Sequence, residues 1–205
     1  MSDESATTPE PASSPSAPAP PDPARSGRAV AVALAAALSL GLDLWTKQWA
    51  WNNLHLPNKR ITVIEKFFYF DFSFNTGAAF GFLEGTGYAR PLFIVITVLT
   101  VLYMLNMVRT LPTRRLYGFI AIGLIIGGAL GNLHDRFIRT LMRGGEEVYG
   151  VVDFILVYYL PGKRWPTFNI ADVALVVGVA LLFPFLLLHA QDPEEDGEQA
   201  APAKS

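Results

Sequence analysis

The chain has 205 residues, of which 51% are hydrophobic, and its formal net charge is -2. A charge this close to zero provides no basic surface for nucleic acid. The absence of cysteine excludes disulfides, thiolate metal sites and cysteine nucleophiles, and three scattered histidines argue against a histidine-rich metal centre. We expect neither a metal nor a cofactor.

Polar segments stand at both ends of the sequence. Residues 1–27 are rich in Pro, Ala, Ser and Thr, and residues 191–205 are acidic. Neither segment has enough large apolar residues to offset the entropy lost on ordering. We therefore expect a solvated tail at each end of one membrane domain over residues 28–190.

The first apolar segment covers residues 29–44 and reaches three tryptophans, Trp45, Trp49 and Trp51, which suit the aromatic belt of a membrane interface. Two arginines before an Ala/Leu core also match a cleavable signal peptide. Three further apolar segments follow, and no small-x-small cleavage site lies beyond the core. A signal anchor that stays in the protein is the preferred interpretation.

Phenylalanines alternate with polar residues in the loop that follows. Phe68, Phe70, Phe72 and Phe74 recur with a period of two, which predicts a strand with one apolar and one polar face. Two interpretations remain open. In the first, the phenylalanines rest on lipid while the polar face of the strand covers a site. In the second, the strand belongs to an ordinary extracytoplasmic sheet.

Three more segments are long and apolar enough to span a bilayer, namely residues 91–108, 116–133 and 170–188. Eighteen helical residues are about 27 Å long. Four glycines of the third segment (Gly123, Gly127, Gly128 and Gly131) fit close helix packing. The expected fold is an all-α membrane protein with four transmembrane helices and a small extracytoplasmic β-sheet.

Basic residues favour one orientation in the membrane. Arg109, Arg114 and Arg115 fall within the short link between the second and third spans, which favours the cytoplasm. The opposite side also has basic residues, but they are spread over longer loops, where they count for less. We expect both termini on the cytoplasmic side.

Four spans bring the polar residues of alternate helix ends to one face of the bilayer. These residues are Asp43, Lys47, Asn75, Asn132, Asp135, Arg136, Asp153, Asn169 and Asp172. Ionisable groups at or inside the membrane boundary are costly, and they mark function by default. The opposite helix ends show arginines and the two tails.

Structural roles compete with function for some of these residues. Asp43 and Lys47 are four residues apart and can simply form an ion pair on one helix. Asp135 and Arg136 can be interfacial charges that end the third span.

Two further acids differ in how well a structural role explains them. Asn169 followed by Asp172 resembles a helix N-cap with an acid at the third position, a role that leaves Asp172 free to act as well. Asp153 lies inside the apolar run Val-Val-Asp-Phe-Ile, and a lone carboxylate there is the hardest of these groups to explain structurally.

Paired carboxylates are the chemistry that suits this face. Ser39 and Ser73 have no evident base, so no serine nucleophile stands out. Two carboxylates at a partly desolvated boundary share one proton, because like charges resist ionising together. The ionised member then takes a proton from water while the protonated member polarises a carbonyl. Such a pair hydrolyses a bond without a cofactor.

Five stretches occur in a fixed order along this four-span frame. They are Asp43-Leu-Trp-Thr-Lys47, Phe74-Asn-Thr-Gly-Ala-Ala-Phe-Gly81, Gly127-Gly-Ala-Leu-Gly-Asn-Leu-His-Asp-Arg136, Val151-Val-Asp-Phe154 and Phe168-Asn-Ile-Ala-Asp172. Through these five stretches, the chain resembles the lipoprotein signal peptidases, the type II signal peptidases of bacteria. The resemblance covers residues 28–189 and leaves out only the tails.

This resemblance implies a membrane aspartyl endopeptidase that removes the signal peptide from diacylglyceryl-modified prolipoproteins by hydrolysing the bond before the lipidated cysteine. By matching motifs, the catalytic aspartates are Asp153 and Asp172. The implied substrate-binding residues are Asn75, Gly77, Asn132 and Arg136, and the implied supporting residues are Asp43, Lys47, Asp135, Asn169 and Ala171.

The resemblance also implies partners and a location. The partners are prolipoproteins that carry a diacylglyceryl cysteine, membrane lipid, and inhibitors of the globomycin type, which occupy the substrate site. The location is the bacterial inner membrane, with the active site at the extracytoplasmic face. We expect a monomer that binds no nucleic acid.

Two features depart from the resembling family. Residues 137–150 look longer than the usual stretch at this point, and their place directly before Asp153 makes them a candidate for altering access or specificity. The N-terminal extension has no assigned role.

Two other classes of protein also carry acids at the membrane. One is a small transporter or ion pathway with relay acids, although four spans without an internal repeat suit this class poorly unless the protein oligomerises. The other is a scaffold that binds lipoproteins without cutting them. Replacing each aspartate by asparagine separates these classes from a peptidase.

Overall fold

The computed structural model describes residues 23–56, 59–77, 88–111 and 115–189, with side chains from residue 26 onward. Of the tail expected over residues 1–27, residues 1–22 lie outside the described part of the chain. Residues 23–27 belong to the first helix. The tail expected over residues 191–205 lies wholly outside it.

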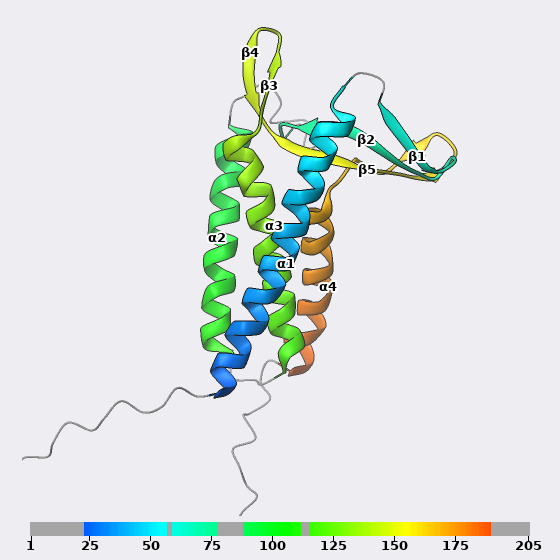
Figure 1. The fold of residues 1–205 in the computed structure, drawn as a ribbon. Helices are drawn as coiled ribbons and strands as arrows, with labels where there is room; N and C mark the ends of the chain where they lie inside the picture. Colours follow the sequence, from blue (N-terminus) through cyan, green and yellow to red (C-terminus); the bar gives the residue numbers. More distant parts are fainter. Residues whose placement is uncertain (1–22, 57–58, 78–87, 112–114, 190–205) are drawn as a thin grey trace, which may run out of the picture.

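Four helices form an elongated bundle (Figure 1), α1 (Pro23–Leu54), α2 (Ala89–Thr110), α3 (Leu116–Ile138) and α4 (Ile170–His189). All four are long and apolar enough to cross a membrane, which confirms the four predicted spans. The first helix continues ten residues past the expected end at residue 44. The added turns are buried on one side, where Lys47, Ala50 and Leu54 are at most 2% exposed.

The central helix of the bundle is α3, which packs against each of the other three. Its glycines allow this approach. A Cβ atom on Gly127 would lie 2.5 Å from the carbonyl oxygen of Ala36 in α1, and one on Gly128 would lie 2.5 Å from that of Ala171 in α4. The predicted role of these glycines in close helix packing is therefore confirmed.

A four-stranded antiparallel sheet extends sideways from the end of the bundle where α1 ends (Figure 1). Its strands, in spatial order, are β1 (Arg60–Ile64), β2 (Phe68–Asn75), β5 (Val151–Leu160) and β6 (Lys163–Arg164). The strand predicted from the alternating phenylalanines is β2. The sequence did not predict β5, which carries Asp153.

The aromatic side of β2 packs on the end of α1. Trp49 contacts Phe70 with 5.4 Å between ring centroids, and Trp51 contacts Phe72 at 5.8 Å. Both pairs are edge-to-face, the arrangement that aromatic quadrupoles favour. The phenylalanines therefore rest on protein, which favours the interpretation of an ordinary small sheet over the one in which they rest on lipid.

Residues 137–150 complete α3 and then form a hairpin of β3 (Thr140–Arg143) and β4 (Glu146–Tyr149). Gly144 and Gly145 make the turn with φ values of 61° and 89°. Two consecutive positive φ angles are those of a type I′ hairpin turn, which glycine accommodates without strain. The hairpin stands on the same end of the bundle as the sheet (Figure 1).

Candidate active site

Asp153 lies in the buried first half of β5, at the junction of the sheet and the bundle. The register of β2 and β5 shifts between Phe70 and Ser73, so that Ser73 stands opposite Asp153. Asp153 is 3% exposed, and two amides hold its carboxylate. Asn169 Nδ2 donates to Oδ1 at 2.7 Å, and Asn75 Nδ2 donates to Oδ2 at 3.1 Å.

Asp172 lies in the first turn of α4, where it closes a reciprocal cap with Asn169. The backbone amide of Asp172 donates to Asn169 Oδ1 at 3.0 Å, and the backbone amide of Asn169 donates to Asp172 Oδ2 at 3.2 Å. This confirms the predicted N-cap. The other carboxylate oxygen, Oδ1, accepts a hydrogen bond from Asn132 Nδ2 at 2.8 Å. Asp172 remains half-buried, so capping leaves its carboxylate accessible.

A single residue, Asn169, joins the two carboxylates. Its side chain donates to Asp153 and its backbone amide donates to Asp172, while Asn169 itself is fully buried. The same side chain also lies 3.2 Å from Asn132 Oδ1. The two aspartates, which come from a strand and a helix, thus face one small group of amides. The sequence indicated Asn169 as a cap but not as the link between the acids.

The environment of Asp153 favours its protonated form. Burial, and after it the negative charge of Asp172, raises the pKa of Asp153 from 3.8 to about 7, while the hydrogen bonds from Asn75 and Asn169 oppose this rise. A large share of Asp153 therefore keeps its proton near neutral pH.

A fully buried charge network lies beneath the two aspartates. Lys47 Nζ is 2.8 Å from Asp43 Oδ2 and 3.6 Å from Asp135 Oδ2, and it donates to Asn132 Oδ1 at 2.8 Å. All three charged residues are 0% exposed. The predicted ion pair on α1 is confirmed, but Asp135 is not an exposed charge that ends a span.

The two acids of this network each hold a backbone amide next to a catalytic candidate. Asp43 Oδ1 accepts a hydrogen bond from the amide of Ala171 at 2.8 Å, one residue before Asp172. Asp135 Oδ2 accepts one from the amide of Val152 at 3.0 Å, one residue before Asp153. The network therefore fixes the backbone that carries both candidates.

Arg139 completes the network from the far side of Asp135. Its Nε donates to Asp135 Oδ1 at 2.9 Å, and its guanidinium also reaches Gln48 Oε1 of α1 at 3.2 Å. Sequence reasoning placed Arg139 in the long stretch before Asp153 and missed this role. The spacing of four residues between Asp135 and Arg139 is the signal that could have indicated it.

A cavity of about 320 Å³ lies beside Asp172. Part of its lining consists of residues expected at the site, namely Asn75, Gly77, Asn132, Arg136 and Asp172. Its remaining lining comes from the spanning helices, namely Phe93, Ile96, Thr97, Thr100, Ala129 and Leu175. One cavity thus joins the candidate site residues to a largely apolar wall formed by the spanning helices.

Two lining residues have fixed positions. The Arg136 guanidinium donates to the carbonyl oxygen of Asn132 at 2.9 Å and lies over the Phe93 ring, 4.7 Å from its centroid. Gly77 has a φ of 97°, and its amide donates to Asn75 Oδ1 at 2.9 Å, which orients the Asn75 amide group toward Asp153. The residues of α2 in this wall were not predicted, because a uniformly apolar span gives no signal for which face lines a cavity.

A larger cavity of about 760 Å³ runs along α1, α3 and α4, but none of the candidate residues lines it. The polar side chain in its lining is Ser39, whose hydroxyl donates to the carbonyl oxygen of Ala35 at 2.8 Å. Ser39 is thus engaged within its own helix and gives no nucleophile. Among the residues that the structure describes, no group of three or more His, Asp or Glu side chains is placed to hold a metal.

Comparison with protein families gives one match over most of the chain. Residues 35–188 match the family model of signal peptidase (SPase) II. The chain is 39% identical to the lipoprotein signal peptidase of Clostridium novyi over 71% of its own length and 90% of the relative. It is also 39% identical to that of Geobacillus kaustophilus, over 77% of its length and 92% of the relative.

Solved structures give the same result for the fold. The chain superposes on a bacterial membrane enzyme solved at 1.9 Å resolution with a TM-score of 0.63 and 30% identity, covering 78% of this chain and 94% of that one. A second bacterial membrane enzyme structure gives a TM-score of 0.62 at 29% identity, covering 82% and 93%.

Proposed function

The chain belongs to the signal peptidase II family and is a membrane protease that removes signal peptides from prolipoproteins, and we propose that Asp153 and Asp172 are its catalytic pair. One observation carries this proposal. Asn169 bonds both carboxylates, and Asp172 lines a cavity that joins the candidate site residues to a largely apolar wall.

The proposed reaction is hydrolysis by a water molecule held between the two carboxyl groups. One carboxylate takes a proton from the water molecule while the water oxygen attacks the scissile carbonyl carbon. The protonated partner donates a hydrogen bond to the carbonyl oxygen. The C–N bond then breaks, and the leaving amine takes up a proton. The raised pKa of Asp153 supports this scheme, because a large share of Asp153 keeps its proton near neutral pH.

Neighbouring residues have two supporting tasks in this scheme. Asn75, Gly77, Asn132 and Arg136 line the cavity and bind the substrate backbone there. Asp43, Lys47, Asp135, Asn169 and Ala171 hold the two aspartates in register. Such positioning matters because misplacement of a reacting group by about 1 Å costs roughly a hundredfold in rate.

The proposed substrate carries a diacylglyceryl group on the cysteine that follows the scissile bond. The apolar wall of Phe93, Ile96 and Leu175 supports this proposal, because it lets an acyl chain stay at membrane depth while the peptide bond reaches Asp172. Inhibitors of the globomycin type would occupy the same cavity. The proposed reaction uses no cofactor, and we propose that a monomer carries it out.

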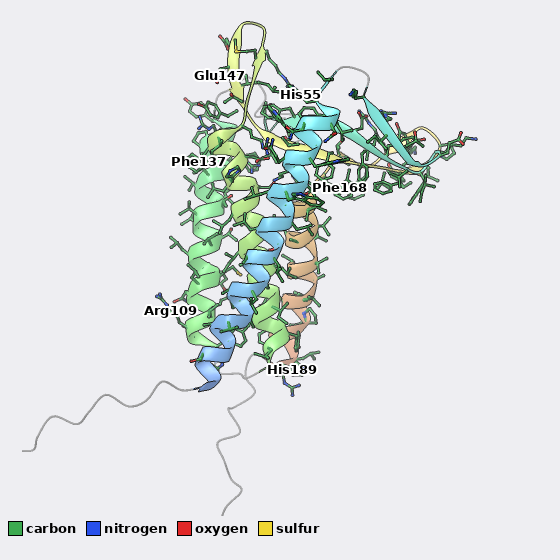
Figure 2. All side chains as sticks on the ribbon, in the orientation of Figure 1. His55, Arg109, Phe137, Glu147, Phe168 and His189 are labelled. Carbon is green, nitrogen blue, oxygen red and sulfur yellow. The ribbon has the colours of Figure 1, made fainter. Side chains whose placement is uncertain are left out.

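The four spans and the family make this a multi-pass bacterial membrane protein. We place it in the inner membrane with both termini in the cytoplasm, because Arg109, Arg114 and Arg115 fall within seven positions of the sequence where the second span gives way to the third. The site lies at the other end of the bundle. Figure 2 shows this separation, with Arg109 and His189 at one end and Phe137 and Phe168 at the other.

Single replacements Asp153→Asn and Asp172→Asn test the catalytic pair. Each removes a charge with little change in shape, and each is expected to lower processing by a factor of about 10²–10⁴ while substrate binding survives. Diacylated, uncleaved prolipoprotein should accumulate in cells and in purified assays. Asp71→Asn is the matched control, since this acid pairs with Arg60 of β1 and does not line the cavity beside Asp172.

Normal processing by either variant would rule out the pair. The same two variants separate the other classes of function. A scaffold would be indifferent to both replacements, and a transporter would lose flux while processing continued.

A further inference from the structure

The end of the four-stranded sheet that lies away from the bundle contains a separate cavity of about 530 Å³. The β1–β2 turn lies beside the end of β5 there, joined by a hydrogen bond from the Tyr158 amide to the Phe67 carbonyl oxygen at 2.8 Å, and the β5–β6 turn also lines the cavity. The lining includes Lys66, Phe67, Tyr69, Tyr158 and Leu160. This cavity is remote from the catalytic pair and plays no part in the proposed hydrolysis.

Lys66 has an unusual backbone conformation at this cavity. Its φ is 64°, the left-handed region that glycine adopts without cost and that a lysine adopts rarely. The Lys66 amide donates to the Tyr69 hydroxyl at 2.6 Å, and the Tyr69 ring packs edge-to-face on Tyr158 at 5.6 Å. The sheet therefore holds a lysine side chain at a position where local geometry favours glycine, a type of outlier that points to function.

Cations and apolar side chains share this end of the sheet. Lys66, Lys163 and Arg164 are exposed, and none of them has an ion pair to another described residue. Two large apolar side chains beside them are also exposed, Leu160 at 53% and Trp165 at 61%.

The acids in the same region do not balance these charges. Glu65 is the neighbour of Lys66 in the turn, and Asp71 already pairs with Arg60. The sheet end therefore carries an excess of positive charge next to exposed aromatic and aliphatic side chains.

The position of the sheet relates this surface to the bilayer. The four spans define the membrane normal, and the sheet leaves the bundle sideways at the level where the spans end (Figures 1 and 2). Trp165 precedes the start of α4 at Ile170 by five residues. Aromatic and basic side chains at this level are typical of the interface between hydrocarbon and headgroups.

We propose that this end of the sheet binds the headgroup of an anionic phospholipid. Lys66, Lys163 and Arg164 bind the lipid phosphates, the Tyr69 hydroxyl contributes a polar group to the cavity, and Leu160 and Trp165 enter the boundary of the hydrocarbon. A neutral headgroup satisfies the exposed aromatic side chains equally well but leaves the excess cations without a partner. Charge complementarity therefore selects an anionic lipid.

Fluorescence quenching at Trp165 tests this proposal with the full chain in bilayers of phosphatidylcholine and phosphatidylglycerol. Only one of the two lipids is brominated in each sample, and the Trp165 signal is the difference between the wild type and Trp165→Phe. We expect brominated phosphatidylglycerol to quench Trp165 more strongly at equal mole fraction, by up to about fivefold per interacting cation, which corresponds to about 1 kcal/mol each. Higher salt should reduce the preference, because exposed charges are screened.

Two variants and one control locate the effect. Lys163→Gln with Arg164→Gln should lower the preference, and so should Lys66→Gly, which relieves the backbone strain and therefore keeps the fold. Arg109→Gln with Arg115→Gln removes two cations at the other end of the bundle and should leave the preference unchanged. Asp153→Asn should also keep it, so that headgroup binding and catalysis fail independently.

Two results would overturn the proposal. One is equal quenching of the wild-type Trp165 by both lipids at low salt. The other is a preference that survives both Lys66→Gly and the double replacement of Lys163 and Arg164.

Discussion

The two ends of the helical bundle use the same helices but are held together differently. Toward one end, Val32, Phe119 and Phe185 form part of a buried apolar cluster. Toward the other end, the same helices bury Asp43 and Lys47 beside Asp135. Buried ion pairs are weak evidence for stability, since desolvation cancels much of their attraction.

The two ends therefore differ in how directional their interactions are rather than in how much those interactions stabilise the bundle. Apolar contacts fill space but have no fixed direction, so they tolerate small movements of the helix backbones. A buried carboxylate makes bonds of fixed direction, and here Asp43 and Asp135 direct theirs to the amides of Ala171 and Val152. The charged end holds two backbones in place, and the apolar end holds the helices together.

Of the changes that compare the two ends, replacing Lys47 by Met should have the largest effect on stability and on processing. The side chain keeps its length but leaves Asp43 and Asp135 buried without their cation, which costs about 3–5 kcal/mol. Because Asn132 also loses its partner, the fraction that still folds should process substrate poorly. Unfolding in mixed micelles containing dodecyl sulfate measures the stability, and processing per folded molecule measures the activity.

The matched change at the apolar end is Phe185→Leu. It removes part of a fully buried ring and should cost about 1–3 kcal/mol. Processing per folded molecule should stay at the wild-type level. Equal activity of the two variants per folded molecule would show that the charge network has no role in positioning.

Glycine replacements in the bundle should change its stability by a smaller amount. In Gly127→Ala the new methyl group meets the Ala36 carbonyl oxygen at 2.5 Å, so α1 and α3 must move apart at a cost of about 1–3 kcal/mol. Gly41→Ala is the control, because nothing lies within 4 Å of its added methyl group. The same unfolding assay should show Gly127→Ala destabilised and Gly41→Ala at least as stable as the wild type.

The pH dependence should show the smallest effect. With a pKa of about 7 for Asp153, the catalytic pair loses its proton above neutral pH, and kcat should fall there. Asn75 stabilises the ionised form through its hydrogen bond, so Asn75→Ala should raise the pKa and move the alkaline limb of the kcat profile to higher pH. A limb that stays in place or moves to lower pH would contradict the assignment.

The same pKa also links pH to folding stability. The folded state holds its proton on Asp153 more tightly than the unfolded chain, so the contribution of this group to folding is fully present below pH 3.8. It is lost as the pH rises toward about 7. Wild-type protein should therefore unfold more readily above pH 7 than at pH 5, as measured by the same unfolding assay.

Local patterns in the sequence predicted much of the fold. Mean hydropathy over about eighteen residues located all four spans, and a period of two located β2. A spacing of four placed Asp43 beside Lys47, and a spacing of three placed Asn169 and Asp172 in one cap. Each of these features depends on residues within one or a few turns of each other, so the sequence alone determines them.

The tertiary structure decided how these pieces meet. Lys47 bonds Asn132 across 85 positions, and Asp43 bonds the amide of Ala171 across 128. The run around Asp153 is a strand because β2 lies beside it, with a register shift that sets Ser73 opposite Asp153. No local periodicity records such contacts, because each depends on the packing of elements that are distant in the chain. The sequence therefore determined which groups lie at one face of the membrane, and only the packing decided that Asn169 joins the two acids.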